Sequence, residues 1–328
     1  MKSDNVIEVN NLKKRFKTYD TKSNKGFFGS LRRKYYWKKA LQGISFTVKK
    51  GEIVLLLGRN GSGKSTLLKT ITGVLYPDEG FTNVFGLNSW ENRKKIAMDL
   101  GVVLGAHGQM YFDLPAMDTF DLMKHIYRIP ENDFKERLNY FVEKLDLKNV
   151  YKRPVRTLSL GEQMKCNFVA SLLHFPKLVI LDEPTIGVDL SSKAELRETI
   201  LEMRKKYKTT FLITTHMVED VEIADRIIVI DDGKIIFEGS KPKLMKYFGD
   251  KRYIELRFIN KKKMDYGKFG KVVEEGYDFL KLETNRKMLS NKQFTSLLAS
   301  PSVIDYNVVG PDLRAAILKL YASAKKRR

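Results

Sequence analysis

A glycine-rich segment that could bind phosphate has the sequence GRNGSGKST and begins at Gly58. It fits the pattern G-x-x-x-x-G-K-[ST], in which backbone N–H groups surround the phosphates of a nucleotide. Its glycines permit tight turns that aim consecutive N–H groups at one anion, and the helix expected after it adds its dipole field. Lys64 would contact the β- and γ-phosphates, and the Ser65 hydroxyl would be a ligand of Mg²⁺. The predicted phosphate-binding residues are Arg59, Asn60, Gly61, Ser62, Gly63, Lys64, Ser65 and Thr66.

Two adjacent carboxylates follow the apolar run that begins at Leu178. Such a run is typical of a fully buried parallel strand, and ligands of parallel sheets bind beyond the carboxyl ends of the strands. Asp182 is therefore expected beside the nucleotide and its Mg²⁺. Glu183, one residue later, could polarise an attacking water as a general base. A solvated turn is the alternative for such a pair in isolation, and the phosphate-binding loop argues against it.

The segment LSLGEQ, which begins at Leu158, makes the resemblance to a family specific. The chain resembles the ATP-binding cassette (ABC) family, whose signature is L-S-G-G-Q. Leu158, Ser159 and Gly161 match, Leu160 replaces the first glycine, and Glu162 stands at the usual glutamine position. The resemblance implies that Ser159, Gly161 and Glu162 contact a nucleotide. From the residues alone, Ser159 is typical of a helix N-cap; a helix start suits a γ-phosphate, and an ordinary cap is the alternative.

Other segments match the family in order. Residues 186–189, with the sequence IGVD, resemble the D-loop, which communicates across a dimer of nucleotide-binding domains. His216 follows a strand predicted over residues 209–215, and the resemblance implies that it contacts the γ-phosphate. Phe16 resembles the aromatic residue that stacks on adenine. The alternatives are a surface histidine at 216 and a core-packing phenylalanine at 16.

The clearest departure from the family lies at the Q-loop. The segment GVVLG, which begins at Gly101, resembles the strand before that loop, but Ala106 stands where the family usually has glutamine. In the family, that glutamine is a ligand of Mg²⁺ and senses the membrane partner. Gln109 is the candidate substitute as a ligand of the nucleotide and of Mg²⁺.

Within the family, the chain is most similar to the ATPases of ABC-2-type exporters, over about residues 5–250. The resemblance implies an ATPase with ATP and Mg²⁺ as cofactors and Lys64, Glu183 and His216 as catalytic residues. It also implies a dimer with a second nucleotide-binding domain, a copy or a homologue, and a separate transmembrane permease subunit at the cytoplasmic face of the cell membrane. The alternative is a soluble ABC ATPase that acts on ribosomes or nucleic acid. Those classes usually have two cassettes in one chain or a long coiled-coil interruption, and neither is evident.

Composition sets further limits. The chain has 328 residues, 43% of them hydrophobic, which suits one large and one small domain. A single cysteine, Cys166, excludes an intramolecular disulfide and fits a reducing compartment. We expect no signal peptide, and no apolar run approaches the roughly 20 residues that span a bilayer. A transport pathway would therefore come from another chain.

The net charge of +21 is unevenly distributed. Residues 1–50 contain 14 Lys or Arg and 3 Asp or Glu, residues 241–328 contain 21 and 9, and the residues between contain 25 and 27. A basic insertion over about residues 20–39 mixes cations with aromatic residues. Such ends predict binding to an anionic membrane surface, although a solvated basic surface or stacking on nucleic acid would use the same residues. The subgroup resemblance favours the membrane, so nucleic acid is not expected as a partner.

The elements that position these residues predict an α/β fold. We expect a P-loop ABC ATPase core with an outer antiparallel β layer, from strands near residues 6–10 and 41–48, and a helical subdomain. Asp231-Asp232-Gly233 between two apolar runs predicts a hairpin. Residues 1–250 would form the nucleotide-binding domain and 251–328 a small α+β accessory domain, in which we find no catalytic or sugar-binding pattern. The helices of the subdomain are predicted over residues 117–128, 132–146 and 160–174.

Overall fold

The computed structural model describes residues 4–19, 35–105, 110–247, 251–261, 265–285, 288, 292–309 and 313–326. The chain divides into two compact units, Met1–Glu238 and Gly239–Arg328. The division falls before the boundary predicted at residue 250, because helix α7 (Lys241–Lys246) packs with helix α10 (Leu313–Lys326) of the second unit. Among the described helices, none is both long enough and apolar enough to cross a bilayer.

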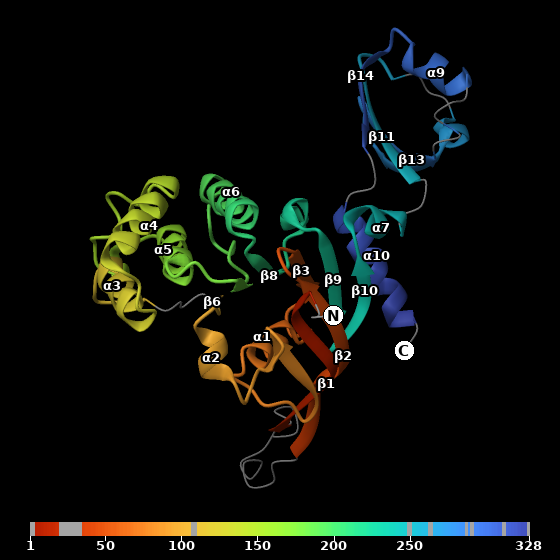
Figure 1. Cartoon of the computed structure of the whole chain (residues 1–328). Coiled ribbons are helices and arrows are strands. Elements are labelled where there is room, and N and C mark those ends of the chain that lie inside the picture. The colour runs from red at the N-terminus through yellow and green to blue at the C-terminus, as the bar shows by residue number, and fades with distance from the viewer. Residues whose placement is uncertain are drawn as a thin grey trace, which may run out of the picture. The chain divides into compact units, whose positions relative to one another are not determined.

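Six strands form a largely parallel sheet in the first unit (Figure 1). They are β3 (Ile53–Gly58), β6 (Leu100–Val103), β7 (Leu178–Asp182), β8 (Thr210–Thr215), β9 (Arg226–Asp231) and β10 (Lys234–Gly239). Their order is β10-β9-β3-β8-β7-β6. Every residue of β3, β7 and β8 is buried, which explains why these strands appear in the sequence as apolar runs without alternation. Because β3 and β7 both pair with β8 in parallel, the carboxyl ends of the three strands lie at the same end of the sheet.

A tight hairpin joins β9 to β10, as the sequence predicts. Asp232 and Gly233 both have positive φ values, 48° and 70°, as a two-residue type I′ turn requires. The N–H of Gly233 donates to the carbonyl oxygen of Ser62 at 2.9 Å. The hairpin turn therefore also supports the glycine-rich loop.

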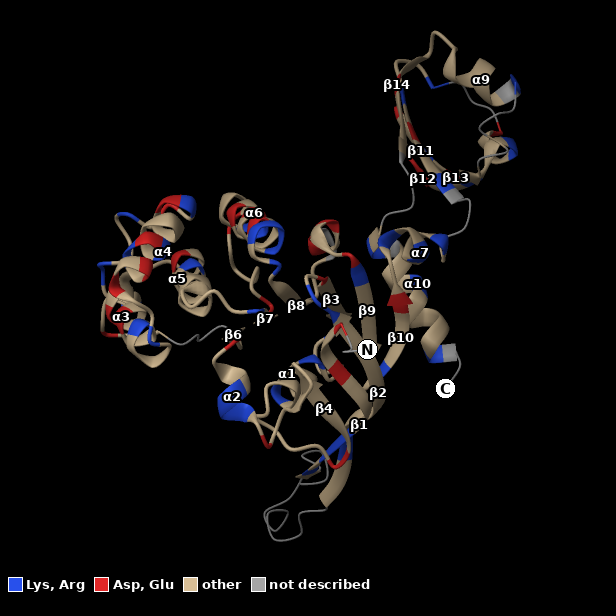
Figure 2. Cartoon of the chain, in the orientation of Figure 1, with Lys and Arg blue, Asp and Glu red and all other residues tan. Residues whose placement is uncertain are grey.

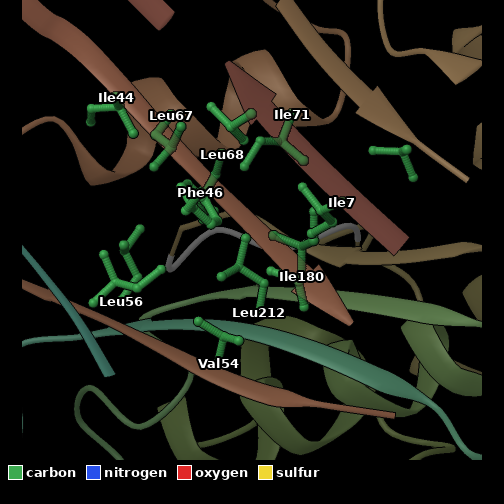
Figure 3. Close-up of a cluster of buried hydrophobic side chains, with 14 of the residues drawn as sticks. Ile7, Ile44, Phe46, Val54, Leu56, Leu67, Leu68, Ile71, Ile180 and Leu212 are labelled. Carbon is green, nitrogen blue, oxygen red and sulfur yellow. The ribbon is translucent and has the colours of Figure 1, made fainter. Parts of the chain in front are cut away.

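The predicted antiparallel layer is a second sheet, of order β2-β1-β4-β5. Its strands are β1 (Asn5–Tyr19), β2 (Tyr35–Lys49), β4 (Glu79–Val84) and β5 (Leu87–Asn88). Helix α1 (Lys64–Ile71) shares one hydrophobic core with both sheets: Figure 3 shows Leu67 and Leu68 of α1 near Ile44 and Phe46 of β2. This packing fixes the start of α1, and with it the glycine-rich loop, between the two layers.

Helices cover the rest of the first unit (Figure 1). They are α2 (Arg93–Ala97), α3 (Ala116–Ile126), α4 (Glu131–Lys144), α5 (Leu160–Leu172) and α6 (Leu190–Tyr207), with short 3₁₀ segments η2 (Val155–Thr157) and η3 (Val218–Ile223). Helices α3, α4 and α5 confirm the three helices predicted for the helical subdomain. Together with the two sheets they confirm the predicted α/β architecture.

The second unit contains a four-stranded antiparallel sheet of order β12-β13-β11-β14. Its elements are β11 (Lys251–Phe258), η4 (Tyr266–Phe269), β12 (Lys271–Glu275), β13 (Phe279–Asn285), α9 (Lys292–Leu298) and β14 (Val303–Val309), besides α7 and α10. Ile254, Leu256, Leu280 and Leu282 pack on Phe294 of α9. Strand β12 was not predicted, because its mostly exposed residues carry no hydrophobic alternation. The remaining elements match the predicted α+β appendage.

Candidate active site

The glycine-rich loop connects β3 to α1 and leaves N–H groups available at the helix start. Gly63 is the N-cap of α1 with φ 110°, and because it has no side chain it cannot cap the N–H groups of the first turn. A Cβ atom on Gly63 would stand 2.5 Å from the carbonyl oxygen of Ala40, so only glycine fits. Gly61 also has positive φ, 80°, and faces open space. The loop therefore has the backbone geometry that an anion at a helix N-terminus requires.

A cleft of about 400 Å³ lies against this loop. Phe16, on β1, lines it with a side chain that is 41% exposed, and its cross-strand partner Lys38 lines it too. The structure thus brings an exposed aromatic ring and the phosphate-binding loop into one concave site, the arrangement that a base and its phosphates need. The lining residues are Phe16, Lys38, Ala40, Asn60, Gly61, Gly63, Lys64, Ser65, Thr66 and Glu183.

Lys64 is held in place inside the site although it carries a charge. It is only 4% exposed, and its Nζ donates to the carbonyl oxygen of Gly58 at 2.7 Å. The same Nζ lies 3.3 Å from Oε1 of Glu183, which compensates its charge. Ser62 of the loop has a buried hydroxyl without a hydrogen-bond partner in the described part of the chain. The loop therefore presents a fixed cation and an unsatisfied hydroxyl.

Glu183 connects the loop to His216. Its Oε2 lies 3.0 Å from Nδ1 of His216. Its backbone has φ 55°, and its N–H donates to the carbonyl oxygen and to Oγ1 of Thr214 at 3.1 and 3.0 Å. These bonds hold the left-handed backbone that turns the carboxylate between Lys64 and His216.

Asp182 ends strand β7 and is buried. Thr214, its partner in the parallel register with β8, donates its hydroxyl to Oδ1 of Asp182 at 2.5 Å. One carboxylate oxygen of Asp182 is thereby fixed in orientation. Thr214 was missed by sequence reasoning, although aligning the carboxyl ends of the two predicted strands would have placed it opposite Asp182.

The signature residues lie at a different place from Lys64. Ser159 is the N-cap of α5, as predicted: its Oγ accepts from the N–H of Glu162 at 3.2 Å, and Oε2 of Glu162 accepts from the N–H of Ser159 at 2.7 Å. The carboxylate of Glu162 thus belongs to a capping box, which the spacing S-x-x-E would have indicated. Gly161 is buried, and Leu160 packs over Gly187 of the D-loop segment. Ser159, Gly161 and Glu162 are absent from the described lining of the cleft at Lys64.

The proposed Q-loop substitute, Gln109, and Ala106 lie outside the described residues. Their roles stay predictions. The same holds for most of the basic insertion, because residues 20–34 are also outside the described part.

Comparisons with known proteins show what the chain is similar to. A family model described as ABC transporter matches residues 41–186. The chain is 34% identical over 226 residues to the linearmycin resistance ATP-binding protein LnrL of Bacillus subtilis, and the match covers 68% of this chain and 72% of that protein. It is 32% identical over 217 residues to ABC transporter G family member 20 of Dictyostelium discoideum, which covers 64% of this chain. The chain spans only 28% of the length of that second relative.

A solved structure shares the fold. A dimeric post-hydrolysis state of the ATP-binding cassette MJ0796, bound to ADP and Pi, superposes with a TM-score of 0.62 at 21% identity. The superposition covers 71% of this chain and 98% of that chain.

Proposed function

The chain belongs to the family of ABC transporter ATP-binding proteins, and on that premise we propose that it is the ATP-hydrolysing subunit of an ABC-2-type exporter. One observation carries the proposal: the carboxylate of Glu183 contacts both Lys64 of the phosphate-binding loop and His216. These three residues come from three distant segments of the sequence. Their meeting beside a cleft lined by Phe16 matches what the hydrolysis of a nucleoside triphosphate needs.

We infer one orientation for ATP in the cleft. Its adenine would stack on the exposed ring of Phe16, and its phosphates would accept from the loop N–H groups and from Lys64. Ser65 and Asp182 would supply the protein's oxygens to a Mg²⁺ site, since this ion takes one or two protein oxygens and fills its other positions with phosphates and water. Bound Mg²⁺ would supply positive charge that stabilises the transferred phosphoryl group.

The protein's own residues would perform the hydrolysis. Glu183 would accept a proton from the attacking water as the general base. His216 would hold the Glu183 carboxylate through the contact at Nδ1 and reach toward the γ-phosphate. Lys64 would stay beside the phosphates and stabilise the charge that develops on them.

A second nucleotide-binding domain would complete the site. Ser159 and Gly161 lie away from the cleft that Lys64 lines, so we infer that they act on the nucleotide of a second subunit, in a head-to-tail dimer. The apolar side chains of Leu160, Ile186 and Leu190 are exposed around the signature and the D-loop, Leu190 by 85%. Such a patch on a soluble surface marks an interaction site, which supports a protein contact there.

The basic N-terminal region would bind the anionic surface of the membrane. On the described ends of β1 and β2, Arg15 lies over the ring of Trp37 and Lys17 over the ring of Tyr35, both at 4.8 Å. All four side chains are exposed. Cations paired with aromatic rings suit the headgroup region, where rings and charges both find partners. In the second unit, α7 adds three lysines (Figure 2).

The proposal places the chain at the cytoplasmic face of the membrane, beside a separate permease subunit. Its test is to purify the full chain in mild detergent, identify the membrane protein that co-purifies, and measure ATP hydrolysis with and without it. We expect hydrolysis that the membrane protein modulates. Tight binding to RNA or DNA at physiological salt, with no membrane partner, would favour the soluble ATPase instead.

A further inference from the structure

A buried carboxylate outside the recognised motifs lies beside the pair Glu183–His216. Asp220, in η3, is 3% exposed. Its Oδ2 accepts from Oγ1 of Thr215 at 2.7 Å and from Oγ1 of Thr185 at 3.0 Å. Thr215 immediately precedes His216, and Thr185 follows Glu183 by two residues. One oxygen atom thus joins the two chain segments that carry the general base and its histidine.

The other oxygen of Asp220 joins this pair to helix α6. Arg197 of α6 donates Nη2 and Nε to Oδ1 of Asp220, at 2.7 and 3.2 Å. Its positive charge compensates the burial of the carboxylate. Helix α6 starts directly after the D-loop, where Asp189 caps it by accepting from the N–H of Ser192 at 2.9 Å. A continuous set of bonds therefore connects the D-loop helix to the segments of the catalytic pair.

Thr215 is the most direct link to His216. Its hydroxyl donates to Asp220 and accepts from the N–H of Met217 at 2.9 Å. The turn that carries His216 is therefore fixed on both sides through one hydroxyl. Loss of the acceptor on Asp220 would release this hydroxyl, and with it the 3.0 Å contact between His216 and Glu183.

We propose that Asp220 is a positioning residue for ATP hydrolysis: it holds His216 against Glu183 and ties their spacing, through Arg197, to the D-loop helix. The kinetic part of this inference rests on the proposed ATPase function. The geometric part does not, because the contact between Glu183 and His216 can be followed without turnover.

The test variant is Asp220→Asn in the full chain, which keeps the side-chain shape, removes the charge and leaves one acceptor oxygen for donors that need two. The matched control is Asp225→Asn. Asp225 also accepts from an arginine of α6, Arg204 at 2.9 Å, but its other oxygen accepts from the N–H of Ile53 at 2.9 Å. Ile53 begins β3, at the end of the sheet opposite the phosphate-binding loop.

Four quantities are measured for each variant: kcat for ATP hydrolysis, the Kd of ATP, the unfolding midpoint, and the NMR resonances of the histidine rings. The chain has four histidines, so His216→Gln assigns the resonance of His216. We expect Asp220→Asn to lower kcat by about tenfold to a hundredfold, the scale of a displacement near 1 Å, with nearly unchanged ATP affinity and a shifted His216 resonance. Asp225→Asn should change neither kcat nor that resonance.

Thr215→Val serves if Asp220→Asn does not fold, and it should change kcat and the resonance in the same direction. An unmoved His216 resonance in a folded variant, or equal losses of kcat in Asp220→Asn and Asp225→Asn, would overturn the proposal. Wild-type protein that binds ATP without hydrolysing it would refute the proposed function, and the resonance would still decide the role of Asp220.

Discussion

Glu183 and Lys64 form an ion pair, with Oε1 of the carboxylate 3.3 Å from Nζ of the lysine, inside the cleft that the phosphate-binding loop lines. The same ammonium group would also form an ion pair with a bound phosphate. A phosphate beside Lys64 would therefore compete with Glu183 and leave its carboxylate to His216 and water. One lysine would thus couple ATP binding to the availability of Glu183 as the proposed general base.

Replacing the general base should separate binding from hydrolysis. Glu183→Gln keeps the size of the side chain but cannot accept a proton, so we expect kcat to fall at least about a hundredfold. ATP affinity should stay the same or rise, because Lys64 no longer has a carboxylate competing with the phosphates. Steady-state hydrolysis and equilibrium ATP binding measure both. Glu79→Gln, which alters an exposed pair with Lys13, is the control, and near-normal kcat in Glu183→Gln would exclude the general-base role.

Removing Lys64 should instead weaken the binding of ATP. Lys64→Ala deletes a buried cation whose charge faces the phosphates, so the Kd for ATP should rise by about tenfold or more. Lys69→Ala is the matched control, since Lys69 lies on the same helix with its side chain in solvent. Isothermal titration with ATP distinguishes them. Equal affinities in the two variants would contradict the phosphate-binding role of the loop.

Membrane binding should depend on the cations at the ends of β1 and β2. Arg15→Ala combined with Lys17→Ala should weaken binding to anionic vesicles about thirtyfold, because each cation near the surface contributes on the order of 1 kcal/mol. Lys94→Ala with Lys95→Ala, on α2, removes the same charge elsewhere. Vesicle flotation across a salt series compares them, and binding should fall as salt rises. Equal losses in both pairs would show that only net charge matters.

Acid should destabilise the fold through His174. Burial lowers the pKa of His174 from 6.5 to about 4, and its ring stacks on Tyr127 with centroids 3.7 Å apart. The unfolded chain takes up a proton below pH 6.5 and the folded one does not, so stability falls as pH decreases from 6.5 to 4. The slope from this one group is on the order of 1 kcal/mol per pH unit.

Urea unfolding at several pH values measures this slope. His174→Phe keeps an aromatic ring beside Tyr127 without a titrating nitrogen, and it should flatten the dependence between pH 6.5 and 4. A variant with the wild-type slope would assign the acid sensitivity to other groups.

The strand, loop and helix that carry the candidate phosphate-binding residues could be predicted from the sequence, because they depend on glycine spacing and on buried strands. Glycines at fixed spacing and apolar runs such as residues 178–181 can be recognised directly in the sequence. Asp220 cannot be recognised in this way, since a buried carboxylate within the short 3₁₀ segment η3 follows no periodic pattern. The exposed edge strand β12 was missed for the same reason.

The strained backbone of Glu183 limits which substitutions the protein can accept at this position during evolution. A residue with a side chain at φ 55° costs on the order of 1 kcal/mol relative to glycine. Glycine would remove that cost, but it would also remove the carboxylate that compensates the charge of the buried Lys64, so its two effects on stability oppose each other. A substitution at this position must therefore satisfy both the left-handed backbone and the buried ammonium group, whatever the chemistry requires.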